Sequence, residues 1–186
     1  MNDIRQTDAQ LLMLIRHFLA IAVLPFVVAV VVPLWLARHD DLHRALAHSL
    51  PGQLGQFAGL CLLLIGVSLF FHSLRRFAAE GEGTLAPWDP PRRLVLRGPY
   101  RYVRNPMISG VLFVLCGEAL VLLSVGLAQW ALAFLLINLL YIPLVEEPQL
   151  KRRFGEPYLE YCRHVPRVLP RLRPWIPAAP SDNRYP

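Results

Sequence analysis

Four long runs of apolar residues constrain the fold more than any other feature of this sequence. The runs cover residues 18–37, 54–74, 107–124 and 127–145, and each is close to the roughly 20 residues that a helix needs to cross a bilayer core. The chain is 55% hydrophobic and only 17% charged, whereas soluble domains carry about 25% charged residues. We therefore predict an all-α integral membrane protein with four transmembrane helices.

The third and fourth runs are separated only by Val125 and Gly126. So short a connection predicts an antiparallel helical hairpin, whose arms begin and end at one membrane face. The second run contains Gly55-x-x-x-Gly59, a spacing of small residues that permits close helix contact. We expect these glycines to pack against a neighbouring span, which we favour over dimerisation. The sequence leaves the oligomeric state open.

Basic residues are distributed unevenly between the runs. Segments 1–17 and 38–53 hold two each, whereas segment 75–106 holds seven and segment 146–186 holds eight. Because lysine and arginine mark the cytoplasmic side, we expect the two rich segments and both termini in the cytoplasm, at a bacterial inner membrane. A net charge of +6 also suits nucleic acid, but topology and anionic lipids already explain arginines beside spans. The expected partner is therefore the lipid bilayer, and no nucleic acid.

The spans leave too few residues for a separate soluble domain, so we predict a single membrane domain with its chemistry at the ends of the helices. Residues 75–106 and 146–173 can form such a site, because the hairpin brings these cytoplasmic segments together. We expect the second segment to fold over the cleft and residues 174–186 to form a flexible tail. The histidines and cysteines have no metal-ligand spacing on one helix, so no metal site is expected.

The end of the first cytoplasmic segment has the features of an anion-binding helix start. Asn105 and Pro106 suit the N-cap and first helical positions, so the third span should begin there. The free N–H groups of this helix start then favour a carboxylate or phosphate, and Arg101 and Arg104 add to that preference. Gly98 begins a turn that brings backbone close to whatever lies in the cleft.

Two further pairs of side chains have a structural and a functional explanation. Tyr100 and Tyr102 offer flat amphipathic faces, but an interfacial aromatic belt explains them equally well. Glu146 and Glu147 end the fourth span beside Pro148, where carboxylates oppose the helix macrodipole. We expect a positively charged ligand, or an arginine of the other segment, to compensate them.

Together these segments resemble a family of membrane enzymes. The matching residues are Gly98-Pro-Tyr-Arg-Tyr-Val-Arg-Asn-Pro-Met with Gly110, then Glu146-Glu147, Phe154-Gly155, Tyr158, Tyr161 and Val165-Pro166-Arg167. Over about residues 81–170 the chain resembles the isoprenylcysteine carboxyl methyltransferase and phospholipid methyltransferase superfamily. It departs from the usual Arg-His-Pro-x-Tyr-x-Gly pattern twice, since Asn105 replaces the histidine and Ile108 stands where tyrosine is common. Asparagine can still cap a helix and hydrogen-bond a ligand.

The resemblance implies a membrane methyltransferase that holds S-adenosylmethionine between the start of the third span, the end of the fourth and the tail. It implies that Arg104 and Asn105 face the carboxylate of the cofactor, and that Tyr158 and Tyr161 cover its adenine. Its ammonium and ribose would face the paired glutamates. The implied cofactor-binding residues are Gly98, Tyr100, Arg101, Tyr102, Val103, Arg104, Asn105, Pro106, Gly110, Glu146, Glu147, Tyr158 and Tyr161, with Arg104 and Glu147 as the catalytic pair.

The expected acceptor is a lipophilic or small molecule that presents a carboxylate, amine or thiol, because a cleft at the membrane face favours arrival from the bilayer. Two other functions stay open: an NADPH-dependent membrane reductase of the sterol-reductase type, which usually has more spans, and a non-catalytic integral membrane protein. Glu118 is the ionisable residue deep in the third span, and intramembrane carboxylates are often functional. A structural partner such as Gln129 or Asn138 on the facing arm is the explanation that we favour.

Overall fold

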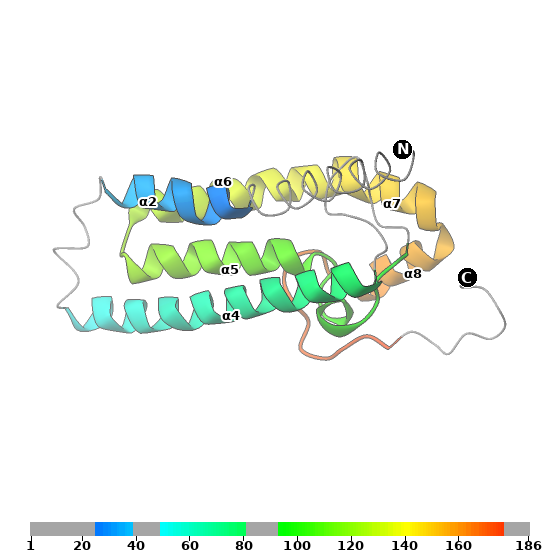
Figure 1. The fold of residues 1–186 in the computed structure, drawn as a ribbon, viewed down its shortest axis with the longest axis horizontal. Coiled ribbons are helices and arrows are strands. Elements are labelled where there is room, and N and C mark those ends of the chain that lie inside the picture. The colour runs from blue at the N-terminus through cyan, green and yellow to red at the C-terminus, as the bar shows by residue number, and fades with distance from the viewer. Residues whose placement is uncertain (1–24, 39–48, 81–92, 177–186) are drawn as a thin grey trace, which may run out of the picture.

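The computed structural model describes residues 25–38, 49–80 and 93–176, and all regular secondary structure within these residues is helical, with no β-strand (Figure 1). Residues 18–24 of the first predicted span, residues 81–92 and most of the predicted tail lie outside the described residues. The prediction of an all-α protein is confirmed. In chain order the elements are η1 (Val27–Val31), α2 (Val32–Ala37), α4 (Leu50–Glu80), η2 (Gly98–Arg101), α5 (Pro106–Val121), α6 (Val125–Tyr141), η3 (Ile142–Glu146), α7 (Glu147–Phe154) and α8 (Glu156–His164).

Long helices lying side by side form the body of the molecule (Figure 1). α5 lies between α4 and α6, and α2 packs against α6. α7 continues from α6, while α8, η2 and the segment after α8 gather at the right-hand end of the view in Figure 1. The two segments that carry the predicted site therefore meet at one end of the bundle.

Within the described residues, two helices are long and apolar enough to cross a membrane: α4, and the continuous helix Val125–Phe154 formed by α6, η3 and α7. Large apolar side chains such as Phe57 (69% exposed) and Ile137 (60% exposed) cover their outer faces, as expected for helices in contact with lipid. Helices Val27–Ala37 and Pro106–Val121 are apolar but shorter. The prediction of a membrane protein with transmembrane helices is confirmed, and the number of four spans stays a prediction.

α4 and α5 touch backbone to backbone through glycine residues. A Cβ atom on Gly59 would lie 2.8 Å from the carbonyl oxygen of Gly117, and one on Gly66 would lie 2.7 Å from that of Gly110. Such distances leave no room for a side chain, so these glycines determine how closely the two helices approach. The expectation that Gly59 packs against a neighbouring span is confirmed. A Cβ atom on Gly55 would meet only a side-chain atom, at 3.7 Å.

The hairpin between α5 and α6 turns at residues 122–124, and not at Val125 and Gly126 as we predicted. Ser124 is the N-cap of α6, and its hydroxyl accepts a hydrogen bond of 3.1 Å from the backbone N–H of Leu127. Because a serine N-cap determines where the helix starts, Gly126 lies in the first turn of α6 and does not interrupt it.

The helix that carries the paired glutamates does not end at them. α6, η3 and α7 are continuous from Val125 to Phe154, with Pro143 inside the π-helical turn η3. The prediction that Glu146 and Glu147 end this helix is therefore wrong, because about two further turns follow them. Its 30 residues extend about 45 Å, more than the roughly 30 Å of a bilayer core. Both glutamates follow Val145, the last residue of the predicted span 127–145.

Candidate functional site

The segment after α8 is hydrogen-bonded to the start of α5. The backbone N–H of Arg104 donates to the carbonyl oxygen of Pro166, at 2.8 Å. The buried hydroxyl of Ser109, inside α5, donates to the carbonyl oxygen of Val168. Further backbone hydrogen bonds join residues 101–105 to residues 167–175. The two segments of the predicted site are thus held against each other by their own backbones.

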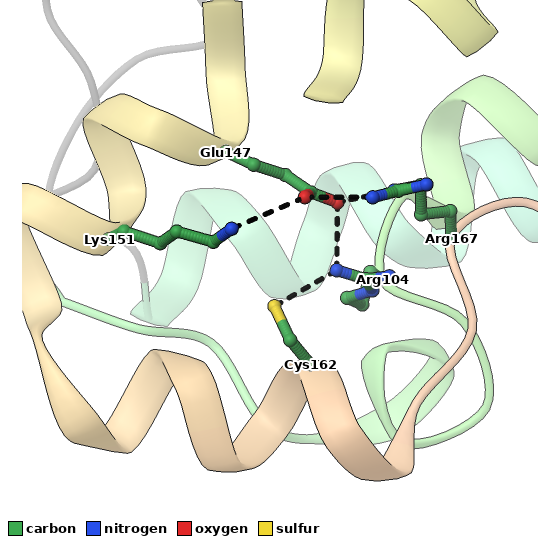
Figure 2. A network of polar contacts seen from close by, with 5 residues as sticks. All are labelled: Arg104, Glu147, Lys151, Cys162 and Arg167. Carbon is green, nitrogen blue, oxygen red and sulfur yellow. Dashed lines mark hydrogen bonds and ion pairs between the residues drawn. The ribbon is translucent and has the colours of Figure 1, made fainter. Parts of the chain in front are cut away.

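A buried carboxylate, that of Glu147, joins the same segments (Figure 2). Its Oε1 accepts hydrogen bonds from Arg104 Nη1, at 2.8 Å, and from Arg167 Nε, at 2.6 Å. Its Oε2 accepts from Arg167 Nη2, at 3.1 Å, and lies 4.0 Å from the Nζ of Lys151. Arg104 Nη1 also donates to Cys162 Sγ, at 2.9 Å. We call these five residues the Glu147 network.

The cations of the Glu147 network compensate the charge of the buried Glu147 carboxylate. Glu147 is only 3% exposed, and an unpaired carboxylate at such a position would be costly. The hydrogen bonds from Arg167 hold the pKa of Glu147 below its usual range against the effect of burial, with help from Arg104 and Lys151. Because three cations surround one carboxylate, the network keeps positive charge and attracts an anionic group.

Glu146, the neighbouring residue, differs from Glu147 in its contacts and in the direction of its pKa shift. Its half-buried carboxyl group forms no hydrogen bond or ion pair with another described residue. Burial, and then the charge of Glu147, raise the pKa of Glu146 to about 7, while Arg104 opposes the shift. A carboxyl group with this pKa is partly charged near neutral pH, and an incoming cation would stabilise its charged form.

Buried donors without a partner lie in the residues that lead into α5. Within the described part of the chain, Tyr100 Oη, Arg101 Nε and Arg104 Nε are buried and make no hydrogen bond. Tyr100 is only 8% exposed, and burial followed by the charge of Glu146 raises the pKa of its phenol. Buried polar groups usually have partners, so this concentration of free donors is a feature of a binding site.

Tyr158 and Tyr161, which we predicted to cover an adenine, lie in a packed core. They are 3% and 2% exposed, and they pack with Val165 and the partly buried Trp175. The hydroxyl of Tyr161 donates to the carbonyl oxygen of Tyr100, at 2.7 Å. Both rings therefore connect α8 to the segment before α5, and a contact with the cofactor stays a prediction.

The start of α5 is as predicted, with Asn105 as N-cap and Pro106 as the first helical residue. The side chain of Asn105 makes no capping hydrogen bond, so its amide is available to other partners. Gly98 has a φ of 57°, in the left-handed region that favours glycine, and begins the turn η2. Gly110 faces α4, where a Cβ atom would lie 2.9 Å from the carbonyl oxygen of Gly66. Packing accounts for Gly110, and cofactor binding by it stays a prediction.

An apolar hollow of about 360 Å³ lies between α4 and the turn that precedes α5. Gly98, Tyr102 and Val103, three of the predicted cofactor residues, contribute to its wall, and His72 adds an imidazole. Leu69 and His72 lie near the end of the predicted span 54–74, and a position of the hollow at the membrane surface stays a prediction. Its lining residues are Leu69, His72, Gly98, Pro99, Tyr102, Val103 and Pro170.

The sequence was compared with known protein families, curated proteins and solved structures. The family model of phospholipid methyltransferases matches residues 54–157, more than half of the 186 residues. The chain belongs to the phospholipid methyltransferase family. The match confirms the predicted superfamily and indicates a membrane methyltransferase, and it includes α4, α5, Arg104 and the paired glutamates. Neither a curated protein nor a solved structure matched the chain.

The structure brings the predicted catalytic pair of this methyltransferase, Arg104 and Glu147, into direct contact. The sequence analysis missed Arg167, Lys151 and Cys162 as members of the same network. Arg167 belongs to the motif that carries the family resemblance, and Lys151 follows the glutamate by four residues on one helix, a spacing that permits an ion pair. Cys162 had no comparable signal.

Glu118 lies outside this site, in the second half of α5. Its Oε2 is buried and has no hydrogen-bond partner within the described residues. Of the partners that we considered, Asn138 donates to the carbonyl oxygen of Phe134 in its own helix, at 2.8 Å, and Gln129 is exposed. Neither residue satisfies the buried oxygen of Glu118.

Proposed function

We propose that this protein transfers a methyl group from S-adenosylmethionine to a lipophilic acceptor at the membrane surface. The observation that carries the proposal is the group of unpartnered buried donors beside the Glu147 network, within a phospholipid methyltransferase sequence. The acceptor that we propose presents a carboxylate, amine or thiol on an apolar body.

The residues beside the network suit both charged groups of the amino-acid part of the cofactor. The free Nε groups of Arg101 and Arg104 are donors for a carboxylate, and the start of α5 adds backbone N–H groups that no side chain caps. Glu146, which makes no hydrogen bond or ion pair within the described residues, is an acceptor for an ammonium. Opposite charges held at separate positions would orient the bound molecule.

When bound, the cofactor supplies a methyl group on a positively charged sulfur, which a nucleophile takes by in-line displacement. The chain contributes binding, orientation and exclusion of water. In this proposal Arg104 contacts the cofactor, whereas Glu147 keeps Arg104 in place through its hydrogen bond of 2.8 Å. A carboxylate acceptor needs no base, but an amine or thiol must lose a proton, and His72 in the apolar hollow can receive it.

The apolar hollow supports a lipophilic acceptor. It is bounded by α4, one of the helices that can cross a membrane, so an apolar chain can reach it from the bilayer. Its position beside Tyr102 and Val103 also places it next to the residues that lead to Arg104.

Filling the hollow tests this assignment. We expect Leu69→Trp, which places a larger side chain in the wall, to lower methyl transfer into lipid by about a hundredfold, because misplacing an acceptor by an ångström has an effect of that order. Its affinity for S-adenosylmethionine should not change. Leu64→Trp is the control, since Leu64 is 59% exposed on the lipid-facing side of the same helix. The assay follows labelled methyl groups into the lipid and water-soluble pools of an extract, and label in the water-soluble pool alone would contradict a lipophilic acceptor.

We also propose four spans with both termini in the cytoplasm. The distribution of basic residues supports this topology, as does the position of α5 alongside α4. Single cysteines placed at Ser49 and Ser181, in a variant without the native cysteines, should be labelled from opposite sides of the membrane. Labelling of both from one side would rule the topology out.

A further inference from the structure

We propose that Arg167 is a positioning residue for the cofactor site and that it acts on Arg104 through Glu147. The inference rests on the proposed function, because Arg104 is the group that would contact the cofactor. Neither the family match, which ends at residue 157, nor the sequence analysis assigns Arg167 a role.

The geometry of the shared carboxylate supports this order of action. Arg167 binds both oxygens of Glu147, with Nε 2.6 Å from Oε1 and Nη2 3.1 Å from Oε2. Arg104 reaches only Oε1, through one nitrogen. A bidentate contact fixes the plane of a carboxylate, whereas a single hydrogen bond leaves it free to rotate. Arg167 therefore sets the direction in which Glu147 meets Arg104.

Arg104 and Arg167 differ in how deeply they are buried, and this difference indicates different roles. The side chain of Arg104 is 11% exposed, whereas that of Arg167 is 41% exposed on the outer side of the same carboxylate. Arg104 also keeps a buried Nε without a partner among the described residues, while Arg167 uses its own Nε on Glu147. Arg104 thus has a donor left for a buried ligand.

The backbone holds Arg167 in place for this task. Its carbonyl oxygen accepts a hydrogen bond of 3.2 Å from the N–H of Asn105, and the preceding Pro166 accepts one of 2.8 Å from Arg104. Arg104 is therefore connected to the segment after α8 twice, through backbone and through Glu147. Loss of the Arg167 side chain would remove the second connection and leave the first intact.

The test compares three variants by calorimetric titration of the purified protein with S-adenosylmethionine. Arg167→Met removes both hydrogen bonds, and we expect it to weaken binding about tenfold, the effect of one charge-assisted hydrogen bond. Arg167→Lys keeps the positive charge but cannot bind both carboxylate oxygens at once. Its affinity for S-adenosylmethionine should therefore lie between those of the wild type and Arg167→Met. Arg173→Met removes the same charge from an exposed position of the same segment and should bind as the wild type does.

The pH profile separates positioning from a general structural role. The hydrogen bonds of Arg167 are the largest influence that lowers the pKa of Glu147, so this pKa should rise in Arg167→Met. Glu147 then loses its charge more readily at low pH. The affinity of Arg167→Met relative to wild type should therefore fall further below one as the pH is lowered from about 8 to 5.5. A structural defect alone would give a ratio that does not vary with pH. The charge of Glu147 raises the pKa of Glu146, so the ratio is also measured in the Glu146→Gln background, where Glu146 cannot titrate. The other groups facing Glu147 are Arg104, Lys151, Tyr158 and Cys162.

Two results would overturn the inference: equal affinities of Arg167→Met and Arg173→Met, or a ratio that is constant over the pH range. If Arg167→Met does not fold, Arg167→Lys carries the same comparison. Failure of the wild type to bind S-adenosylmethionine would instead refute the proposed function, and the inference with it.

Discussion

α5 itself and the segment that leads into it are held in place by opposite means. Within the bundle, α5 meets α4 where side chains are missing, and Gly66 and Gly110 let the two backbones touch. At its N-terminal end, α5 follows Arg104, which is held by the buried carboxylate of Glu147. Volume dominates in the first region, where no charged group takes part and one side-chain hydrogen bond, from Gln56 Nε2 to the carbonyl oxygen of Val121 at 3.2 Å, joins the two helices. In the second, every charge depends on a partner, because burial makes an unpaired charge costly.

This difference predicts how each region responds to substitution. At the glycine contact, any added side-chain atom should lower the stability of the protein, and the loss should not depend on pH. The charged region should distinguish between neighbouring residues of the same type, because Glu147 is fully paired and Glu146 has no partner among the described residues.

The largest effect is expected from Glu147→Ala. This variant leaves Arg104 buried without a counter-ion, and breaking a buried ion pair in this way typically costs about 3–5 kcal/mol of unfolding free energy. Glu156→Ala is the control, because its ion pair with Arg163 is exposed and should contribute less than about 1 kcal/mol. Thermal unfolding in detergent measures both, and equal stability of the two variants would refute a structural role for the Glu147 network.

A somewhat smaller effect is expected from Gly66→Ala. The new methyl group would lie 2.7 Å from backbone atoms of α5, and relieving that overlap should cost about 1–3 kcal/mol. Gly55→Ala adds the same methyl group with its nearest neighbour, the side chain of Leu123, at 3.7 Å, so it should be neutral or slightly stabilising. Comparable unfolding temperatures for the two variants would show that the helices are not in backbone contact.

The helices and the family could be predicted from the sequence because both depend on local signals. Apolar runs predict spans from hydropathy alone. The turn was misplaced because Val125 and Gly126 separate the two runs, whereas Ser124 is the N-cap of α6. The end of the fourth helix was misplaced because the apolar run ends at Val145 and Pro148 follows the glutamates, whereas the helix continues through Pro148 to Phe154.

The contacts between distant residues could not be predicted in the same way. The opposition of Gly66 and Gly110 depends on the register of two helices, which no local pattern encodes. The bidentate contact of Arg167 with Glu147 depends on how the chain returns after α8, over a separation of 20 residues. The sequence therefore indicated which residue types belong to the site, but not which carboxylate is paired.

The smallest effect on stability, and the most selective effect on function, is expected from Glu146→Gln. Because Glu146 has no partner among the described residues, the variant should unfold like the wild type. It should nevertheless bind S-adenosylmethionine ten- to a hundredfold more weakly, since a charge-assisted hydrogen bond of about 1.5–3 kcal/mol is lost. Unchanged affinity in Glu146→Gln would remove Glu146 from the cofactor site, and a large loss of stability would show that it is paired after all.

The most direct test of the central claim is a pair of calorimetric titrations of the purified wild-type protein, one with S-adenosylmethionine and one with NADPH. A methyltransferase site built on Arg104 and Glu146 predicts saturable binding of S-adenosylmethionine and no heat of binding with NADPH. Binding of NADPH instead would assign the protein to a reductase, and binding of neither would contradict the account of the site as a cofactor site.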